Sequence, residues 1–256
     1  MLTIILYDFE QTSNKKINNM LLKTNINYSP NFDSKKRSKK KIKFIVFHYT
    51  GMRSEKGAIS RLTNIQSEVA SHYFIKRSGE IINLVPDLYI AWHAGFSAWK
   101  KYSLLNQNSI GIEISNPGHQ FGYKKFTKNQ IRSLIRLSKY LIKKYNVNQN
   151  NILGHSDIAP LRKKDPGEKF PWEHLAKKNI GKWHRLNKKK LKKLRNKECE
   201  KKNIKFFDYL FRIGYSKKYK ELNPKKLIKA FQRRYRPQLI NGRIDEECLL
   251  IAKNLV

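Results

Sequence analysis

Three residues of metal-binding type stand beside short apolar runs or in a turn. His48 follows the run at residues 44–47, His155 follows the run at 152–154, and Asp165 lies in the turn-forming segment 163–167. Two neutral imidazoles and one carboxylate, with a fourth position left to water, form a ligand set suited to catalytic zinc. A lone histidine is more often a surface or core residue than a ligand, so this hypothesis depends on what positions the three side chains.

The segments around these residues have the patterns of strands and helices in alternation. The predicted strands are residues 44–47, 72–85 (two strands around a Ser78-Gly79 turn), 109–115 and 151–154. A helix is predicted from its N-cap Thr127 to about residue 145, because apolar side chains recur there at helical spacing. We therefore expect an α/β fold, with a mixed central sheet flanked by helices.

Six short motifs occur in a fixed order along the chain. They are VFHYT (46–50), SHYFI (71–75), AWHAG (91–95), SIGIE (109–113), GHSDIAP (154–160) and KKDPG (163–167). Together they resemble the type 2 N-acetylmuramoyl-L-alanine amidases, zinc enzymes related to phage-lysozyme-type amidases and peptidoglycan recognition proteins. The resemblance covers about residues 42–178. It implies hydrolysis of the amide bond between the lactyl group of N-acetylmuramic acid and L-alanine, in peptidoglycan or muropeptides.

The resemblance also implies a role for individual residues. One zinc ion per chain would be held by His48, His155 and Asp165. Glu113 falls where family members carry an acidic residue facing the metal, and it could pass a proton from water to the leaving amine. Lys163 matches the lysine two positions before the carboxylate ligand and could stabilise the oxyanion. Its neighbours, Arg162 and Lys164, are competing assignments for that position.

Other residues near the motifs have both functional and structural interpretations. We expect Trp92 and His93 to contact substrate, because an aromatic ring beside a donor and a small-residue loop suits a sugar. His72 is expected to hold a loop by hydrogen bonds and is left out of the catalytic set. Glu113 could instead be a solvent-facing strand residue, although Gly111 and Ser115 leave room for a ligand beside it. Asp157, two residues after a candidate ligand, could orient a group that surrounds the ligands or cap the next turn, and both interpretations stay open.

The C-terminal part resembles a second known unit. AFQRRYRP (230–237) and NGRID (241–245) are similar to the small three-helix peptidoglycan-binding module, with helices predicted at 204–213, 224–235 and 245–255. The expected domains are a lead-in (1–41), a zinc amidase domain (42–183), a basic, partly helical linker (184–203) and this helical module (204–256). About fifty residues bury only a thin core, so we expect a tether that soluble substrates do not need.

Composition limits the remaining function classes. The 256 residues carry a formal net charge of +36, with 29% charged residues, and no apolar run approaches a membrane span. Charge alone favours an anionic partner, but the basic linker has no interleaved aromatic residues, so nucleic acid is not expected as the physiological ligand. A muropeptide-binding protein without activity is the main alternative. The two cysteines, Cys199 and Cys248, could pair or stay free.

Localisation has two opposing signals in the sequence. The apolar start of the chain, residues 1–8, lacks a basic n-region and a small-residue cleavage site, which favours the cytoplasm. A wall-binding tail favours the cell envelope. Both locations stay open.

Overall fold

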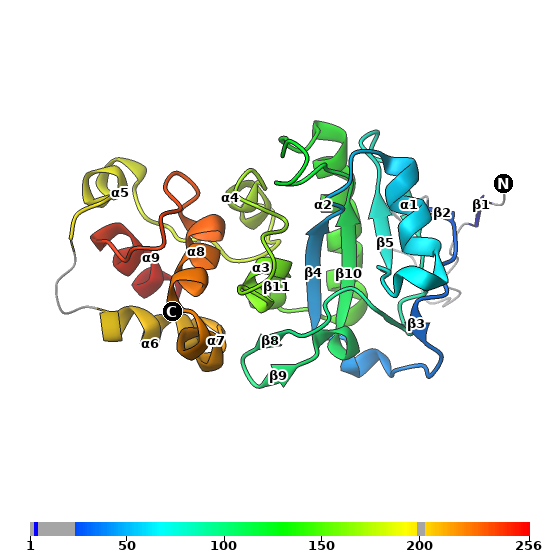
Figure 1. The fold of residues 1–256 in the computed structure, drawn as a ribbon, viewed down its shortest axis with the longest axis horizontal. Coiled ribbons are helices and arrows are strands. Elements are labelled where there is room, and N and C mark those ends of the chain that lie inside the picture. The colour runs from blue at the N-terminus through cyan, green and yellow to red at the C-terminus, as the bar shows by residue number, and fades with distance from the viewer. Residues whose placement is uncertain (1–2, 5–23, 199–202) are drawn as a thin grey trace, which may run out of the picture.

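A seven-stranded mixed sheet lies at the centre of the computed structural model, which describes residues 3–4, 24–198 and 203–256. The strand order is β1-β2-β6-β5-β10-β4-β11. The strands are β1 (Thr3–Ile4), β2 (Thr24–Ile26), β4 (Phe44–Tyr49), β5 (Tyr73–Ile75), β6 (Ile81–Asn83), β10 (Ser109–Ile114) and β11 (Ile152–Gly154). Two small ribbons pair β3 (Phe32–Asp33) with β7 (Ile90–Ala91) and β8 (Ala98–Trp99) with β9 (Tyr102–Ser103). The expected mixed α/β architecture is confirmed (Figure 1).

The central strands β4, β10 and β11 run parallel to one another. Strand β4 begins with four apolar residues and β10 has isoleucine at alternate positions, and nearly all of these side chains are buried because the sheet is covered on both faces. Parallel strands bring their carboxyl ends to one edge, so the last residues of β4 and the residues that follow β11 meet there. In the register of β4 and β10, Glu113 lies beside His48.

Helix α2 (Lys128–Tyr145) packs on the sheet as predicted. Thr127 caps it through a capping box with Gln130, and its apolar stripe, including Leu134 and Leu137, joins the core of the sheet. The other helices of this part are α1 (Glu55–Thr63), α3 (His155–Ile158) and α4 (Trp172–Ala176). Helix α1 was not predicted from the sequence, because only two of its residues, Ala58 and Leu62, are buried.

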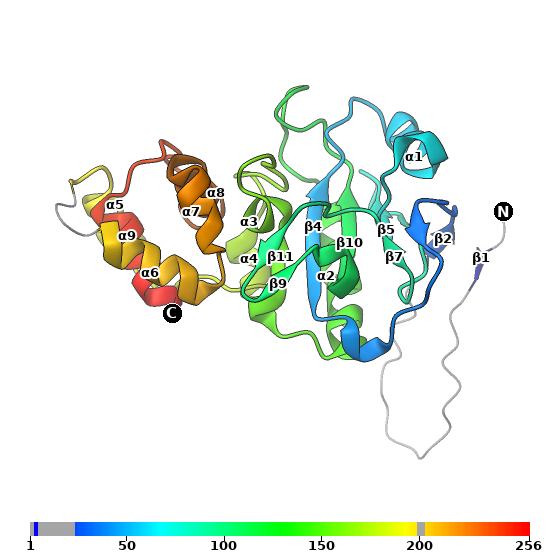
Figure 2. The same ribbon diagram turned by 60° about the horizontal axis from the view of Figure 1, so that its bottom comes forward.

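The C-terminal part is helical and lies at one end of the sheet, next to α3 and α4 (Figures 1 and 2). Its helices are α5 (Lys188–Leu194), α6 (Asn203–Ile213), α7 (Lys217–Leu222), α8 (Pro224–Tyr235) and α9 (Glu246–Leu255). The three helices predicted for residues 204–256 correspond to α6, α8 and α9. Helix α7 was missed because only Tyr219 of its residues is buried and no apolar stripe marks it.

Residues 204–256, from here on the C-terminal module, share a core with the part of the chain that forms the sheet. Phe206, Leu210 and Phe231 belong to the same buried cluster as Phe44 and Trp99. The backbone of Gly214, with φ +138°, lies against the Trp99 indole, and a Cβ at this position would come within 2.4 Å of the ring. The expectation of a thin separate core is therefore wrong. The sequence of the module shows which of its side chains are apolar. It does not show that they share a core with Phe44 of the distant strand β4.

The lead-in and the linker also take part in the fold. Arg37 lies in the lysine- and arginine-rich run at 35–43, where a solvated side chain is expected, but it is buried and donates to the carbonyls of Asp87 and Asn106. Leu191 of α5 is buried against the C-terminal module. Cys248 is buried, whereas Cys199 and most of residues 1–8 lie outside the described residues. Among the described residues, no helix is long and apolar enough to cross a membrane.

Candidate active site

The three candidate ligands converge at the carboxyl edge of the sheet. His48 is on β4, His155 begins α3 directly after β11, and Asp165 lies in the loop that follows. The Nδ1 atoms of the two histidines are 2.9 Å apart, and each lies 3.1 Å from Oδ2 of Asp165. All three residues are buried, and their donor atoms lie within 4.8 Å of one another. This donor set and its spacing suit a single divalent metal ion such as zinc.

The second nitrogen of each histidine is held by the surrounding protein. Nε2 of His155 donates to the carbonyl of Ala94 at 3.1 Å, and Nε2 of His48 lies 3.0 Å from Nδ1 of His93. These contacts leave both Nδ1 atoms facing Asp165. Metal ligands are usually oriented by such outer partners.

The protonation states also fit metal binding. Burial, together with the neighbouring His155, lowers the pKa of His48 to about 4. Burial alone would raise the pKa of Asp165, but His155 and His48 hold it well below its usual range. A neutral imidazole and a carboxylate are the forms that bind a metal ion.

Glu113 points into the same site from β10. Its Oε2 is enclosed and has no hydrogen-bond partner in the described part of the chain. Burial and the nearby Asp165 raise the pKa of Glu113 to about 8, while Lys163 acts in the opposite direction. An enclosed polar atom without a partner is uncommon in folded proteins and often marks a functional group. Glu113 is therefore a candidate general base rather than a solvent-facing strand residue.

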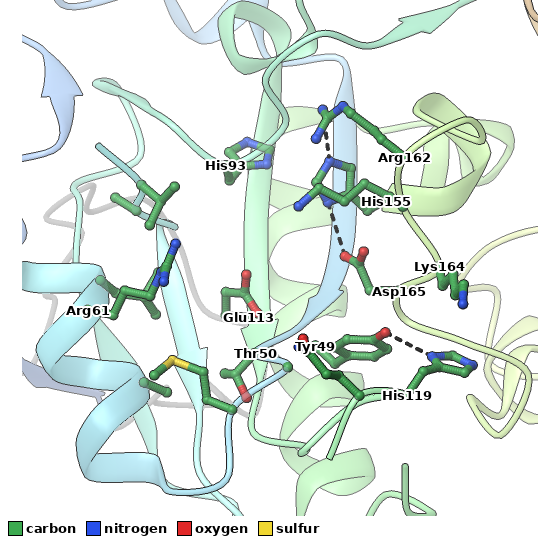
Figure 3. Close-up of a pocket in the computed structure, with 18 of the residues that line it drawn as sticks. Tyr49, Thr50, Arg61, His93, Glu113, His119, His155, Arg162, Lys164 and Asp165 are labelled. Atoms are coloured by element: carbon green, nitrogen blue, oxygen red, sulfur yellow. Dashed lines mark hydrogen bonds and ion pairs between the residues drawn. The ribbon is translucent and has the colours of Figure 1, made fainter. Parts of the chain in front are cut away.

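A cavity of about 690 Å³ opens over these residues. The candidate residues Glu113, Lys163, Trp92 and His93 line it together with His155 and Asp165, so the structure brings the predicted catalytic and substrate-contacting residues to one place. Figure 3 shows His155 between Arg162 and Asp165, with Glu113 across the cavity. Lys163 is half-buried, whereas Lys164 is exposed.

His93 has a position that the sequence analysis did not foresee. Its Nδ1 lies 3.0 Å from His48 and its Nε2 lies 3.1 Å from the Ser109 hydroxyl. The ring also lies against Gly111, where a Cβ would come within 2.4 Å. The room expected at Gly111 for a ligand is therefore filled by this imidazole. The indole of Trp92 donates to Asp33. Contact of His93 and Trp92 with substrate stays a prediction.

His72 has the structural position expected of it. It is buried and accepts from the Gly111 backbone at 3.0 Å.

Two residues that line the cavity, His119 and Arg162, have contacts that the sequence did not indicate. His119 lies in the turn after β10 and forms hydrogen bonds with Tyr49 at 2.8 Å (Figure 3) and with Glu168 at 2.9 Å. Arg162 donates to the carbonyls of Ala94 and Phe96. These bonds connect the loop after β7 to the loop that carries Asp165. For His119, the position just beyond the end of a central strand was the available signal.

The sequence of the chain matches one protein family over its central half. The N-acetylmuramoyl-L-alanine amidase family, Amidase_2, matches residues 38–168. N-acetylmuramoyl-L-alanine amidase AmiD of Escherichia coli strain K12 is 37% identical over 234 residues, which cover 84% of this chain and 83% of AmiD. The 1,6-anhydro-N-acetylmuramyl-L-alanine amidase AmpD of Haemophilus influenzae is 32% identical over 163 residues, which cover 57% of this chain and 86% of AmpD.

Solved structures give the same picture at the level of the fold. E. coli AmiD, in complex with the substrate anhydro-N-acetylmuramic acid-L-Ala-D-gamma-Glu-L-Lys, superposes with a TM-score of 0.74 at 34% identity, covering 87% of this chain and 91% of AmiD. AmpDh3 from Pseudomonas aeruginosa superposes with a TM-score of 0.73 at 26% identity, covering 98% of both chains. Both matches extend beyond the sheet into the C-terminal helices.

Proposed function

The chain belongs to the N-acetylmuramoyl-L-alanine amidase family, and from that premise we propose how its residues perform the reaction. It is an enzyme that hydrolyses the amide bond between N-acetylmuramic acid and L-alanine in muropeptides. The observation that carries the assignment of residues is the buried cluster of His48, His155 and Asp165, because His155 and Asp165 line the same cavity as Glu113. A binding protein without activity would not need all four groups.

We propose that His48, His155 and Asp165 hold one zinc ion, with Nδ1 of each histidine as the ligand atom. When bound, zinc polarises the scissile carbonyl and makes water a better nucleophile. Burial lowers the pKa of His48, and the two histidines hold the pKa of Asp165 well below its usual range, so neither residue has to lose a proton at neutral pH to bind the ion.

Glu113 and Lys163 supply the proton transfer and the charge stabilisation in this proposal. The unpartnered Oε2 of Glu113 can take a proton from the attacking water and deliver it to the leaving nitrogen of L-alanine. Lys163 carries a positive charge on the cavity wall, close enough to influence the pKa of Glu113. It can stabilise the negative charge that develops on the carbonyl oxygen.

The substrate is proposed to be a muropeptide whose stem peptide carries carboxylates. AmiD and AmpDh3 have been solved with anhydromuramic peptides. In this chain, Arg61, Arg162, Lys163 and Lys164 line the cavity and give it a positive charge that suits such a peptide. Trp92 and His93 are the proposed contacts to the sugar.

Replacing Lys163 by alanine is expected to lower kcat with a smaller effect on KM, because its charge matters most when the oxyanion forms. Loss of one oxyanion donor typically costs ~10²–10³ in kcat. The measurement is steady-state hydrolysis of a soluble muropeptide. Lys164→Ala is the matched control, since Lys164 lines the same cavity from an exposed position. A larger loss in the Lys164 variant would transfer the role to Lys164.

We propose that the C-terminal module holds the enzyme on polymeric wall. A groove of about 420 Å³ lies between α5, α6 and α9, with Leu249 and Leu250 along it and Tyr209 and several lysines beside them. Such a mixture of aromatic, apolar and cationic groups suits a glycan chain that bears carboxylates.

Tyr209→Ala is expected to weaken sedimentation with insoluble sacculi while activity on a soluble muropeptide stays unchanged. The pull-down is done at low salt and at 1 M salt, where the Debye length is ~3 Å and adhesion by net charge is suppressed. Tyr28→Ala, at an exposed tyrosine far from the module, is the control. Equal sedimentation of both variants and the wild type at high salt would contradict a binding role for this groove.

A further inference from the structure

Arg234, on α8 of the C-terminal module, reaches across to the amidase part and is buried there. Its guanidinium forms an ion pair with Asp157 and also donates to the carbonyl of Ile152 at 3.0 Å. The guanidinium also stacks on the Trp172 ring, 4.0 Å from its centroid. Both members of the ion pair are almost fully enclosed, with 2% and 1% of their side chains exposed. The pair therefore joins the two parts of the chain in a water-free environment.

Asp157 connects this ion pair to the segment that carries a candidate metal ligand. It lies on α3, the short helix that begins with His155. Its Oδ2 accepts from the backbone N–H of Gly154 at 2.8 Å, and its Oδ1 accepts from the hydroxyl of Tyr215 at 2.9 Å. The carboxylate thus fixes the residue before His155 on one side and is held by the C-terminal module on the other.

Another contact of the C-terminal module ends on the same turn. The hydroxyl of Tyr219 donates to the carbonyl of Ile158, the last residue of α3, at 2.7 Å. Arg234 itself holds the carbonyl of Ile152, in strand β11 just before the turn. The backbone is therefore anchored on both sides of His155, from β11 to the end of α3, by side chains from the C-terminal module.

A second arginine makes a parallel connection. Arg233 lies 3.7 Å from Glu168, three residues after Asp165, and Glu168 in turn bonds His119. His119 bonds Tyr49, the neighbour of His48. Each of the three candidate ligands therefore has a near neighbour in sequence that is linked to α8.

We infer that Arg234 and Tyr215 are positioning residues for His155, so that the C-terminal module helps to build the metal site as well as binding wall. The inference rests on the proposed zinc site. Because Asp157 is enclosed, loss of Arg234 leaves a buried carboxylate without its cation, and the turn must rearrange to reach water or another donor. A small movement of that turn displaces Nδ1 of His155 from the other two ligand atoms.

Zinc affinity, measured by competition with a chromogenic chelator, tests this inference directly. We expect Arg234→Gln to weaken zinc binding by ~10–100-fold, the range typical for loss of an outer partner of a ligand. Arg234→Lys keeps the charge and is expected to restore part of the affinity. Tyr215→Phe removes only one hydrogen bond to Asp157 and is expected to give a smaller loss.

Arg236→Gln is the matched control. Arg236 is also a buried arginine at the end of α8, but it forms ion pairs with Asp245 and Glu247, which both lie within the module. This variant should lower the melting temperature of the metal-free protein, as Arg234→Gln should, yet leave zinc affinity unchanged.

The outcomes separate the inference from the metal site itself. If the wild type binds no zinc, the proposed site is wrong and the inference falls with it. If the wild type binds zinc and Arg234→Gln binds it equally well, or if Arg236→Gln loses as much affinity, the inference alone is overturned. Where Arg234→Gln does not fold, Tyr215→Phe decides: affinity equal to the wild type overturns the inference, and a reproducible loss supports it.

Discussion

His155→Ala is expected to abolish both metal binding and amide hydrolysis. The substitution removes one of three buried ligand atoms that lie within 4.8 Å of one another, and no other histidine is placed to take its role among the described residues. His93, the nearest candidate, has both ring nitrogens engaged by His48 and Ser109. The loss of zinc affinity should therefore exceed the ~10–100-fold typical for removing an outer partner.

Elemental analysis and chelator competition measure the metal, and hydrolysis of a soluble muropeptide measures the activity. The control is His174→Ala, at an exposed histidine of α4 that does not line the active-site cavity. Full zinc occupancy and normal turnover in His155→Ala would show that the ligand set is wrong. Loss of zinc with retained turnover would show that the metal does not take part in the reaction.

Glu113→Gln is expected to keep zinc but to lower hydrolysis by ~10²–10⁴-fold. Glutamine has the same shape but cannot take a proton from water. The raised pKa of Glu113 has a second consequence: the carboxylate is the active form, so activity should rise as pH rises through that pKa. A bound cation shifts this rise to lower pH, because it favours the charged form. In Glu113→Gln the rise should disappear.

The pH profile of kcat/KM on a soluble muropeptide gives this result, with zinc content checked in each sample. Glu173→Gln is the matched control and should keep the profile of the wild type. Glu173 lies on α4 and forms an ion pair with Lys188 of α5. Near-normal turnover in Glu113→Gln would place the general base elsewhere. An unchanged rise with pH in a slow variant would assign the titration to another group.

The parts of the fold that depend on local pattern were predictable from the sequence. The strand around His48, the strand carrying Glu113 and the helix capped by Thr127 all appear where apolar spacing and capping residues place them. The grouping of His48, His155 and Asp165 was implied by the resemblance of the motifs to the amidase family, and the structure brings the three side chains together. These features depend on neighbours within a few residues or on a regular strand arrangement.

Contacts between distant segments were not predictable in the same way. The sequence left Asp157 with two possible roles. In the structure its carboxylate accepts from the backbone N–H of Gly154 at the start of α3 and also binds Arg234, 77 residues later. Arg37 looked like part of a solvated basic run, yet it is buried against the loop around Asp87. The local composition does not show which cation of a basic run is solvated and which is buried against a distant segment.

Cleavage of a defined muropeptide by metal-free and zinc-restored protein tests the central claim most directly, with the products identified by mass spectrometry. The account predicts no cleavage after chelation. After one equivalent of zinc is added, it predicts release of a peptide that begins with L-alanine, together with N-acetylmuramic acid carrying a free lactyl carboxylate. Cleavage at another bond, or an equal rate in the metal-free protein, would contradict it.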